Sequence, residues 1–163
     1  MILIAGQKNT DMLKIILITT LFVIFGVKII AQTPADTVAI KECIMNYIEG
    51  YYQADANRMD KALHPELAKR AVFTDKAGNP FIQGMGKSLL IHATRNNTNK
   101  NVLNPDAEFK AEIQIFDITG INASAKCTTN KFTFFDYFHL AKWNDEWKII
   151  NVLWNMLPQP QPE

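Results

Sequence analysis

Between positions 34 and 51, apolar residues recur every three or four places, which is the pattern of an amphipathic helix. The apolar stripe consists of Ile40, Cys43, Ile44, Tyr47, Ile48 and Tyr51. Pro34 suits the first turn of this helix, and Thr33 and Asp36 fit an N-terminal capping box. Inside a helix, Gly50 costs about 1 kcal/mol relative to alanine, which favours a close packing contact at that position. The pattern predicts one long helix with a single buried face.

Shorter elements follow this helix. Asp55 is a suitable N-cap for a second helix, and Pro65 can open one further helical turn. Gly84 and Gly86 precede a third helical segment, and residues rich in Gly, Asn and Pro mark the turns. The expected elements are a helix over 56–63, a helical turn over 65–70, a short strand over 71–73, a turn over 76–80, a helix over 87–94 and a loop over 95–105.

From Ala107 onward the hydrophobic period changes to two, which is the period of a β-strand. Ile113 and Ile115 alternate with polar residues, and Gly120 ends this run. Three further strands are expected over 121–128, 131–143 and 146–156. Four sequential strands joined by short turns form an antiparallel meander. Helices placed ahead of such a sheet indicate an α+β domain and not a doubly wound one.

The third of these strands carries aromatic residues on both faces. By alternation, one face holds Phe132, Phe134, Phe138 and Leu140, and the other holds Phe135, Tyr137 and His139. An antiparallel sheet can leave one face in water, yet here both faces are apolar. We expect one face to meet the helices and the other to meet a second copy of the chain, since an aromatic patch of this size is typical of an interaction surface. The sequence therefore predicts a homodimer formed through the sheet.

An uncharged, mostly apolar run of 13 residues covers positions 15–27, between Lys14 and Lys28. At about 1.5 Å per residue, a helix of this length spans about 20 Å, less than the roughly 30 Å of a hydrocarbon core. A short apolar segment behind a basic start is typical of a secretory signal peptide. We therefore expect cleavage to remove residues 1–31, with Met12 as the more natural start of translation.

Two other interpretations of this segment stay open, an uncleaved membrane anchor and a buried core helix. We rank cleavage first because Lys28 interrupts the apolar run. In a bacterial cell, a cleaved signal makes the mature protein periplasmic or secreted, with no stable membrane span. The mature domain then covers residues 32–157, and residues 158–163 form an extended, proline-rich tail.

The charge balance excludes several classes of function. The chain holds 17 Lys and Arg against 16 Asp and Glu, and its formal net charge of +1 becomes −1 once residues 1–31 are removed. This balance argues against a nucleic-acid binder held by bulk electrostatics. Two cysteines and three scattered histidines form no metal-binding motif, and no GxGxxG or P-loop pattern occurs. We therefore expect no metal and no bound cofactor.

Two pairs of segments resemble those of one known family. The first pair is YIEGYYQAD at 47–55 with LHPELAKR at 63–70, and the second is FDYFHLAK at 135–142 with WKIINVLW at 147–154. Over roughly residues 36–157, their order and spacing are similar to the putative lumazine-binding family of the NTF2-like superfamily. The resemblance implies a SnoaL/ketosteroid-isomerase-like cone, in which a curved antiparallel sheet wraps a long N-terminal helix and two short helices. It also implies a pteridine-type ligand, and it brings no catalytic residues.

The cone implied by this resemblance leaves a pocket at its open end. We expect its lining to include Tyr47, Tyr51, Phe134, Asp136 and Trp154. Asp136 is the most suggestive of these residues because it is a carboxylate in an apolar run, where burial makes it a candidate general acid or base. The alternative, which we favour, is a structural aspartate at the rim of the sheet or paired with a lysine or a tyrosine.

The histidines are expected to be structural. His64 is expected to brace the turn that follows it through Arg70 or a backbone carbonyl, and His92 is expected to lie in solvent. His139 lies on the opposite face of its strand from Asp136, so a His–Asp pair is not expected.

Cys43 and Cys127 lie on the helix and sheet faces that are expected to pack together. A disulfide is conceivable if their Cα atoms lie within about 7 Å, but two buried free thiols are the favoured interpretation. Trp143 and Trp147 are interpreted as packing residues.

Three functions stay open at this point. The leading hypothesis is an exported domain that binds a small, flat, partly apolar molecule without catalysing a reaction. The second is an isomerase or cyclase in which Asp136 moves a proton and Tyr47 or Tyr51 stabilises an oxyanion; a deeply buried Asp136 within hydrogen-bond reach of a pocket tyrosine would support it. The third is a dimeric assembly module whose interior is packed without a cavity.

Overall fold

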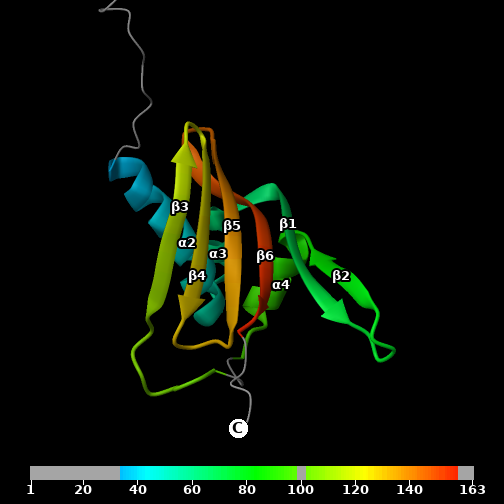
Figure 1. The fold of residues 1–163 in the computed structure, drawn as a ribbon. Helices are drawn as coiled ribbons and strands as arrows, with labels where there is room; N and C mark the ends of the chain where they lie inside the picture. The colour runs from blue at the N-terminus through cyan, green and yellow to red at the C-terminus, as the bar shows by residue number, and fades with distance from the viewer. Residues whose placement is uncertain (1–33, 99–101, 158–163) are drawn as a thin grey trace, which may run out of the picture. The chain divides into compact units, whose positions relative to one another are not determined.

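The computed structural model of the protein describes residues 34–98 and 102–157. Within these residues, six strands form one sheet in the order β2-β1-β6-β5-β4-β3, and three helices lie against one face of it (Figure 1). The helices are α2 (Pro34–Tyr52), α3 (Ala56–Ala62) and α4 (Lys87–Arg95). The strands are β1 (Leu63–Thr74), β2 (Pro80–Met85), β3 (Ala111–Thr119), β4 (Asn122–Thr129), β5 (Phe134–Trp143) and β6 (Glu146–Met156). This is the α+β arrangement that the sequence predicts.

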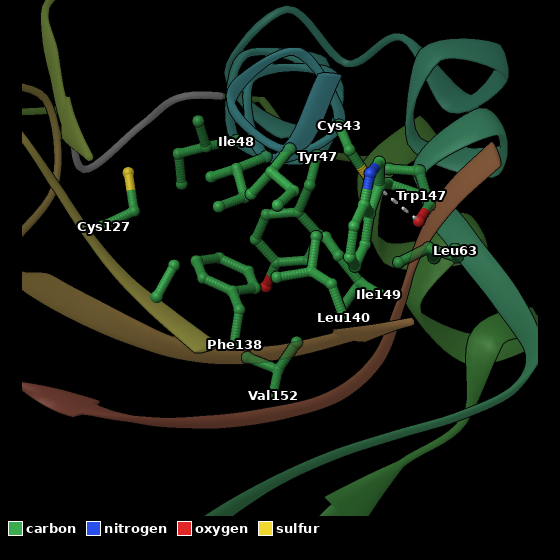
Figure 2. Packing of buried hydrophobic residues seen from close by; sticks show 14 of the residues in the cluster. Cys43, Tyr47, Ile48, Leu63, Cys127, Phe138, Leu140, Trp147, Ile149 and Val152 are labelled. Carbon is green, nitrogen blue, oxygen red and sulfur yellow. Dashed lines mark hydrogen bonds between the residues drawn. The ribbon is translucent and has the colours of Figure 1, made fainter. Parts of the chain in front are cut away.

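Helix α2 buries the predicted apolar stripe against the sheet. The most deeply buried residues of the stripe are Ile40, Ile44, Tyr47 and Ile48. Figure 2 shows α2 nearly along its axis, with Tyr47 and Ile48 pointing down toward the side chains of β5, among them Phe138 and Leu140. The ring of Tyr47 meets that of Phe138 edge-on, with centroids 5.2 Å apart. The helical spacing therefore places Tyr47 between the helix and the sheet.

The junction of α2 and α3 agrees with the local sequence signals. Oδ1 of Asp55 accepts hydrogen bonds from the backbone N–H groups of Asn57 and Arg58, each at 3.0 Å, so the predicted N-cap is confirmed. Gly50 lies against the first turn of α3, where an added Cβ atom would come within 3.1 Å of the backbone nitrogen of Met59. The close contact predicted at this glycine is also confirmed.

Residues 65–70 belong to strand β1, so the helical turn predicted there is wrong. Alternate side chains from Leu67 to Ala71 are buried, which is the pattern of a strand with one inward face. Pro65 suits a first helical turn, but here it lies in the register shift before Ala68, a place where a strand tolerates its missing N–H group. Pairing with β6 overrides the local helical preference.

The sheet is mixed, whereas the sequence predicts an antiparallel one. Strand β1 runs parallel to β6, and it forms an antiparallel hairpin with β2, a strand that is absent from the predicted elements. Most of β2 is exposed, so it shows no hydrophobic alternation that would reveal it. In Figure 1 this hairpin diverges from the other strands. Asp75 closes its turn by accepting hydrogen bonds from the backbone N–H groups of Ala77 and Asn79, both at 2.8 Å.

Strands β3 to β6 form the predicted antiparallel meander. In β5, Asp136, Phe138 and Leu140 point inward and are at most 1% exposed, while Tyr137 and His139 point outward. The two faces predicted for this strand are therefore confirmed.

Strand β5, the third strand of the meander, begins at Phe134 and not at residue 131 as the sequence predicts. Lys131 is fully buried, and its Nζ donates hydrogen bonds to the backbone carbonyls of Asn104 (2.7 Å), Pro105 (3.2 Å) and Ala107. Because these carbonyls compensate the buried charge, Lys131 anchors the preceding loop instead of pairing in the sheet.

Several predictions fall outside the described residues. They concern the signal segment 1–31, the start at Met12, the cap by Thr33 and the tail 158–163. Within the described residues, no helix is both long and apolar enough to cross a membrane.

Candidate functional site

A cavity of about 540 Å³ is bordered by α2, α4 and the inward face of the sheet. This volume lies within the roughly 300–1,000 Å³ that is typical of ligand pockets. Its aromatic lining residues are Tyr47, Tyr51, Phe132, Phe134 and Trp154. Among the described residues of the lining, Lys69 is the only charged one, and Asn97, Thr98 and Thr133 are the other polar contributors besides the tyrosines. The pocket therefore offers large apolar surfaces and few polar groups.

Four of the five predicted pocket residues, Tyr47, Tyr51, Phe134 and Trp154, lie in this lining. The fifth, Asp136, is not part of it and is fully buried in the sheet behind Tyr47 and Lys69. Their part in binding a ligand stays a prediction.

Three buried polar groups meet at the edge of the cavity. Nζ of Lys69 lies 2.7 Å from Oδ1 of Asp136 and 2.5 Å from the hydroxyl oxygen of Tyr47. The Tyr47 hydroxyl donates to the same Asp136 oxygen at 3.3 Å. The hydrogen-bond directions agree with one another, because the tyrosine oxygen accepts from the ammonium group and gives its own proton to the carboxylate.

Each member of this triad comes from a different element. Tyr47 lies on the buried stripe of α2, Asp136 on the inward face of β5, and Lys69 on the inward face of β1. Strand β6 lies between β1 and β5, and pairs Val152 with Lys69 and Trp154 with Asp136. The long side chain of Lys69 therefore reaches across β6 to the carboxylate.

Sequence reasoning misses Lys69 because it predicts a helical turn for residues 65–70. In such a turn, Lys69 would be one of several solvated charges. The alternation of Leu67, Lys69 and Ala71, which continues the strand predicted from residue 71, is the signal that could have found it.

Asp136 is both deeply buried beside a pocket tyrosine and paired with a lysine. From the sequence, the first is the expected mark of a catalytic residue and the second is that of a structural one. The residue is fully buried, which excludes the rim position, and it is within hydrogen-bond reach of a pocket tyrosine. It is also paired with a lysine, as the structural interpretation expects. Its second oxygen, Oδ2, has no hydrogen-bond partner among the residues that the structure describes. A buried carboxylate with a free lone pair can accept a proton, so the geometry alone does not reduce Asp136 to a structural role.

Burial keeps both pocket tyrosines in the phenol form. Desolvation, and after it the negative charge of Asp136, raise the pKa of Tyr47 well above its ordinary value of 10.0. The same two causes, in the same order, raise the pKa of Tyr51. Both hydroxyl groups therefore remain hydrogen-bond donors at neutral pH.

Two aromatic rings lie beside the Lys69 ammonium group. Its Nζ lies 5.0 Å from the ring centroid of Trp154 and 5.8 Å from that of Phe134. Rings at such distances stabilise a cation through their quadrupoles. The lysine is therefore held by its hydrogen bonds to Asp136 and Tyr47 and has Trp154 and Phe134 beside it.

The histidines lie away from this triad. Nδ1 of His64 accepts a hydrogen bond from the backbone N–H of Glu66 at 3.2 Å, and its ring packs edge-on against Trp143. His64 thus braces the start of a strand through a backbone N–H group, and not a helical turn through Arg70 or a backbone carbonyl as the sequence predicts. His92 is exposed on α4, and His139 is exposed on the outer face of β5, opposite to Asp136 as predicted.

Cys43 and Cys127 are buried free thiols, as the sequence favours. Figure 2 shows them well apart across the hydrophobic cluster, Cys43 beside Trp147 and Cys127 at the far end. Desolvation raises the pKa of each thiol to about 12. Among the described residues, no three His, Cys, Asp or Glu side chains gather where they could hold a metal ion.

A family model described as putative lumazine-binding matches residues 35–155. Comparison with curated proteins finds no significant match.

Solved structures resemble this fold over most of the chain. An NTF2-like protein of unknown function from Shewanella baltica shares 28% identity at a TM-score of 0.62, covering 78% of this chain and 99% of that one. A second such protein, from Methylobacillus flagellatus, shares 23% identity at a TM-score of 0.60, covering 78% and 97%. A ketosteroid isomerase-like protein from Erwinia carotovora atroseptica shares 11% identity at a TM-score of 0.51, covering 78% and 100%, a likeness of fold alone. The NTF2-like fold expected from the sequence is thereby confirmed.

Proposed function

The chain belongs to the putative lumazine-binding family, and on that premise we propose that its domain binds a small, flat, partly apolar molecule in the cavity beside α2. The observation that carries this proposal is an aromatic-lined cavity of about 540 Å³ whose described lining holds one charged residue, Lys69. A pteridine is the form of ligand that the family description suggests. The cavity argues against the third hypothesis, an assembly module with a packed interior.

Tryptophan fluorescence tests this function. Trp154 lines the cavity, so a bound pteridine or flavin should quench its emission. We expect lumazine or riboflavin to give saturable quenching that is largely lost in Trp154→Phe. The matched control is Trp143→Phe, since Trp143 is 54% exposed and is not part of the lining. Quenching that never saturates with either compound would remove the pteridine form of the proposal.

A second candidate function, proton transfer as in an isomerase or cyclase, is favoured by one observation. Asp136 is buried, accepts a hydrogen bond from Tyr47 and keeps Oδ2 without a partner. Because Asp136 is not in the lining, it would take the proton of a substrate by way of the Tyr47 hydroxyl, and Lys69 or Tyr51 would stabilise the oxyanion that forms.

Hydrogen–deuterium exchange distinguishes this candidate from simple binding. The protein is incubated in D₂O with 2-tetralone, a flat ketone whose protons next to the carbonyl group are exchangeable. The loss of the NMR signals of these protons is followed over time. Catalysed exchange that disappears in Asp136→Asn but persists in Asp117→Asn, at an exposed carboxylate, would favour the enzyme. Exchange at the buffer rate in all three proteins would exclude Asp136 as a base for this ketone.

We further propose that the outer face of the sheet forms a homodimer. Phe116, Tyr137 and Leu153 are each at least 40% exposed there, and they come from β3, β5 and β6. The rings of Phe116 and Tyr137 lie 6.0 Å apart, so the apolar surface is continuous.

Sedimentation at micromolar concentration should give a dimer, and Tyr137→Glu should give a monomer. Val38→Glu, at an exposed apolar position on α2, should leave the dimer intact. A monomeric native protein would contradict the proposal.

We also propose that residues 1–31 direct export, as the short apolar run between Lys14 and Lys28 suggests. Expression of the full chain in a bacterial host, followed by cell fractionation, should give a periplasmic or secreted protein that begins at Gln32. Recovery of the uncleaved chain in the membrane fraction would favour the anchor instead.

A further inference from the structure

Lys69 retains one hydrogen-bond donor for a ligand. An ammonium group has three N–H donors. In the triad, one N–H donates to Oδ1 of Asp136 and one to the hydroxyl oxygen of Tyr47. Within residues 34–98 and 102–157, the third has no acceptor. Because Lys69 is part of the cavity lining, this donor is within reach of the cavity.

The two partners of Lys69 also keep its ammonium group at one place. The Tyr47 hydroxyl can only accept from Lys69, because an ammonium group has no lone pair, and its own proton goes to Asp136. Oδ1 of Asp136 lies 2.7 Å from Nζ of Lys69, and its negative charge balances the positive charge of the lysine. The triad therefore has no net charge. An acceptor supplied from the cavity would complete the three hydrogen bonds that this largely buried ammonium group can donate.

The remainder of the lining is complementary to a flat body with its acceptor at one edge. Trp154 and Phe134 meet edge-to-face, with centroids 6.0 Å apart, and both lie next to the Lys69 ammonium group. None of the described lining residues is acidic, whereas Lys69 brings a positive charge, so this part of the lining favours an acceptor over a cation. The Tyr51 hydroxyl adds a second donor farther along α2.

We propose that Lys69 determines which ligands the pocket accepts, by donating its third N–H to a carbonyl or anionic oxygen at the buried edge of a flat molecule. This proposal rests on the binding function proposed above and specifies its ligand class. Flat molecules without such an oxygen should fill the same space but bind more weakly. Since a hydrogen bond from a charged donor is involved, the expected difference in affinity is about 10- to 100-fold.

Three probes with the same flat body test the inference by equilibrium dialysis. 2-Naphthoate presents an anionic oxygen, 2-acetylnaphthalene presents a carbonyl oxygen, and 2-methylnaphthalene presents neither. The native protein should bind the first two at least about 10-fold more tightly than the third. Lys69→Met should remove this preference and leave the affinity for 2-methylnaphthalene nearly unchanged. The matched control, Lys41→Met at an exposed position on α2, should keep the preference.

A second variant covers the case in which Lys69→Met does not fold. Lys69→Met combined with Asp136→Asn removes both buried charges together, so no uncompensated charge remains. It should also lose the preference. If the native protein and the double variant bind all three probes with equal affinity, the role of Lys69 is excluded while the binding function stands. If the native protein binds none of the probes, the binding function fails for this ligand class and the role of Lys69 fails with it.

Discussion

At the scale of single residues, Lys69 and Asp136 bear opposite charges in the interior, with side chains only 9% and 1% exposed. A buried ion pair contributes little to stability when both partners are replaced together, because each charge has lost its hydration. Removal of one partner is different, since it leaves the other charge buried without compensation. The two residues therefore have to be considered as one unit.

The first prediction follows from that coupling. Lys69→Met should lower the free energy of unfolding by about 3–5 kcal/mol, and adding Asp136→Asn should restore more than half of this loss. Urea denaturation at pH 7 measures both values. Lys142→Met is the control, because Lys142 pairs with Asp36 at 3.2 Å in a more exposed position and should cost at most about 1 kcal/mol. A loss in Lys69→Met no larger than in the control would contradict the coupling.

The thiols give a second prediction at this scale. Desolvation raises the pKa of Cys43 and of Cys127 to about 12, so at pH 8 only about one thiol in ten thousand is ionised. In guanidinium chloride, iodoacetamide should alkylate both thiols. Over the same time, we expect it to leave both thiols of the folded protein unmodified. Mass spectrometry counts the added groups. Rapid alkylation of either thiol in the folded protein would show that it is accessible and ionised.

At the scale of elements, the sequence predicts most accurately where hydrophobic periodicity is strong. Helix α2 and the strands β3 to β6 have one buried face each, and the sequence places them to within a few residues. Only the end of strand β1, over 71–73, is predicted as a strand, because a proline and several charged residues occupy its first part, whose structure depends on pairing with β6. Strand β2 is missed because its side chains are mostly exposed. The local hydrophobic pattern therefore fails to predict a strand whose formation depends on pairing with a neighbouring strand and not on the burial of one face.

Gly50→Ala is the prediction for the junction of α2 and α3. In an isolated helix this change stabilises by about 1 kcal/mol. Here the new Cβ would lie 3.1 Å from the backbone nitrogen of Met59 and 3.3 Å from the carbonyl oxygen of Asp55, and neither backbone atom moves without disturbing the cap of α3. We expect a net loss of about 1–3 kcal/mol in the free energy of unfolding.

Glu42→Ala is the matched control for this change, because Glu42 is exposed on the same helix. Alanine there should be neutral or slightly stabilising. Thermal unfolding followed by circular dichroism compares the two variants. If Gly50→Ala raised the melting temperature as much as Glu42→Ala does, helix propensity would outweigh the packing at the junction.

At the scale of the whole molecule, the candidate site depends on contacts that sequence spacing does not encode. Tyr47, Lys69 and Asp136 come from three elements, and their positions along the chain are 22 and 67 residues apart. Four lining residues could be predicted because they are aromatic and fall on inward faces of periodic elements. A lysine partner for Asp136 could be expected, but Lys69 could not be identified as that partner. The pair needs the position of β1 next to β6, and a lysine on an inward face is rare enough to be interpreted as a surface residue.

The same burial makes the folded protein sensitive to alkali. The pKa of each thiol is raised from 9.0 to about 12, and that of Tyr47 is raised well above 10.0. Between pH 9 and pH 12 the unfolded chain releases these protons while the folded chain retains them, so unfolding becomes more favourable as the pH rises. Below pH 9 both states hold the protons and the effect vanishes.

Each buried thiol should therefore reduce the free energy of unfolding by about 1.4 kcal/mol per pH unit once the pH exceeds 9. Urea denaturation at pH 8, 9, 10 and 11 measures this slope. Cys43→Ala combined with Cys127→Ala lowers stability at every pH by loss of packing, but it should make the decline above pH 9 shallower, leaving the part due to Tyr47 and other groups. The comparison of slopes separates ionisation from packing, because lost packing does not depend on pH. An equal decline in the native protein and the double variant would mean that the thiols ionise as easily in the folded state as in the unfolded one. Their positions on the buried faces of α2 and β4 would then not desolvate them as deeply as expected.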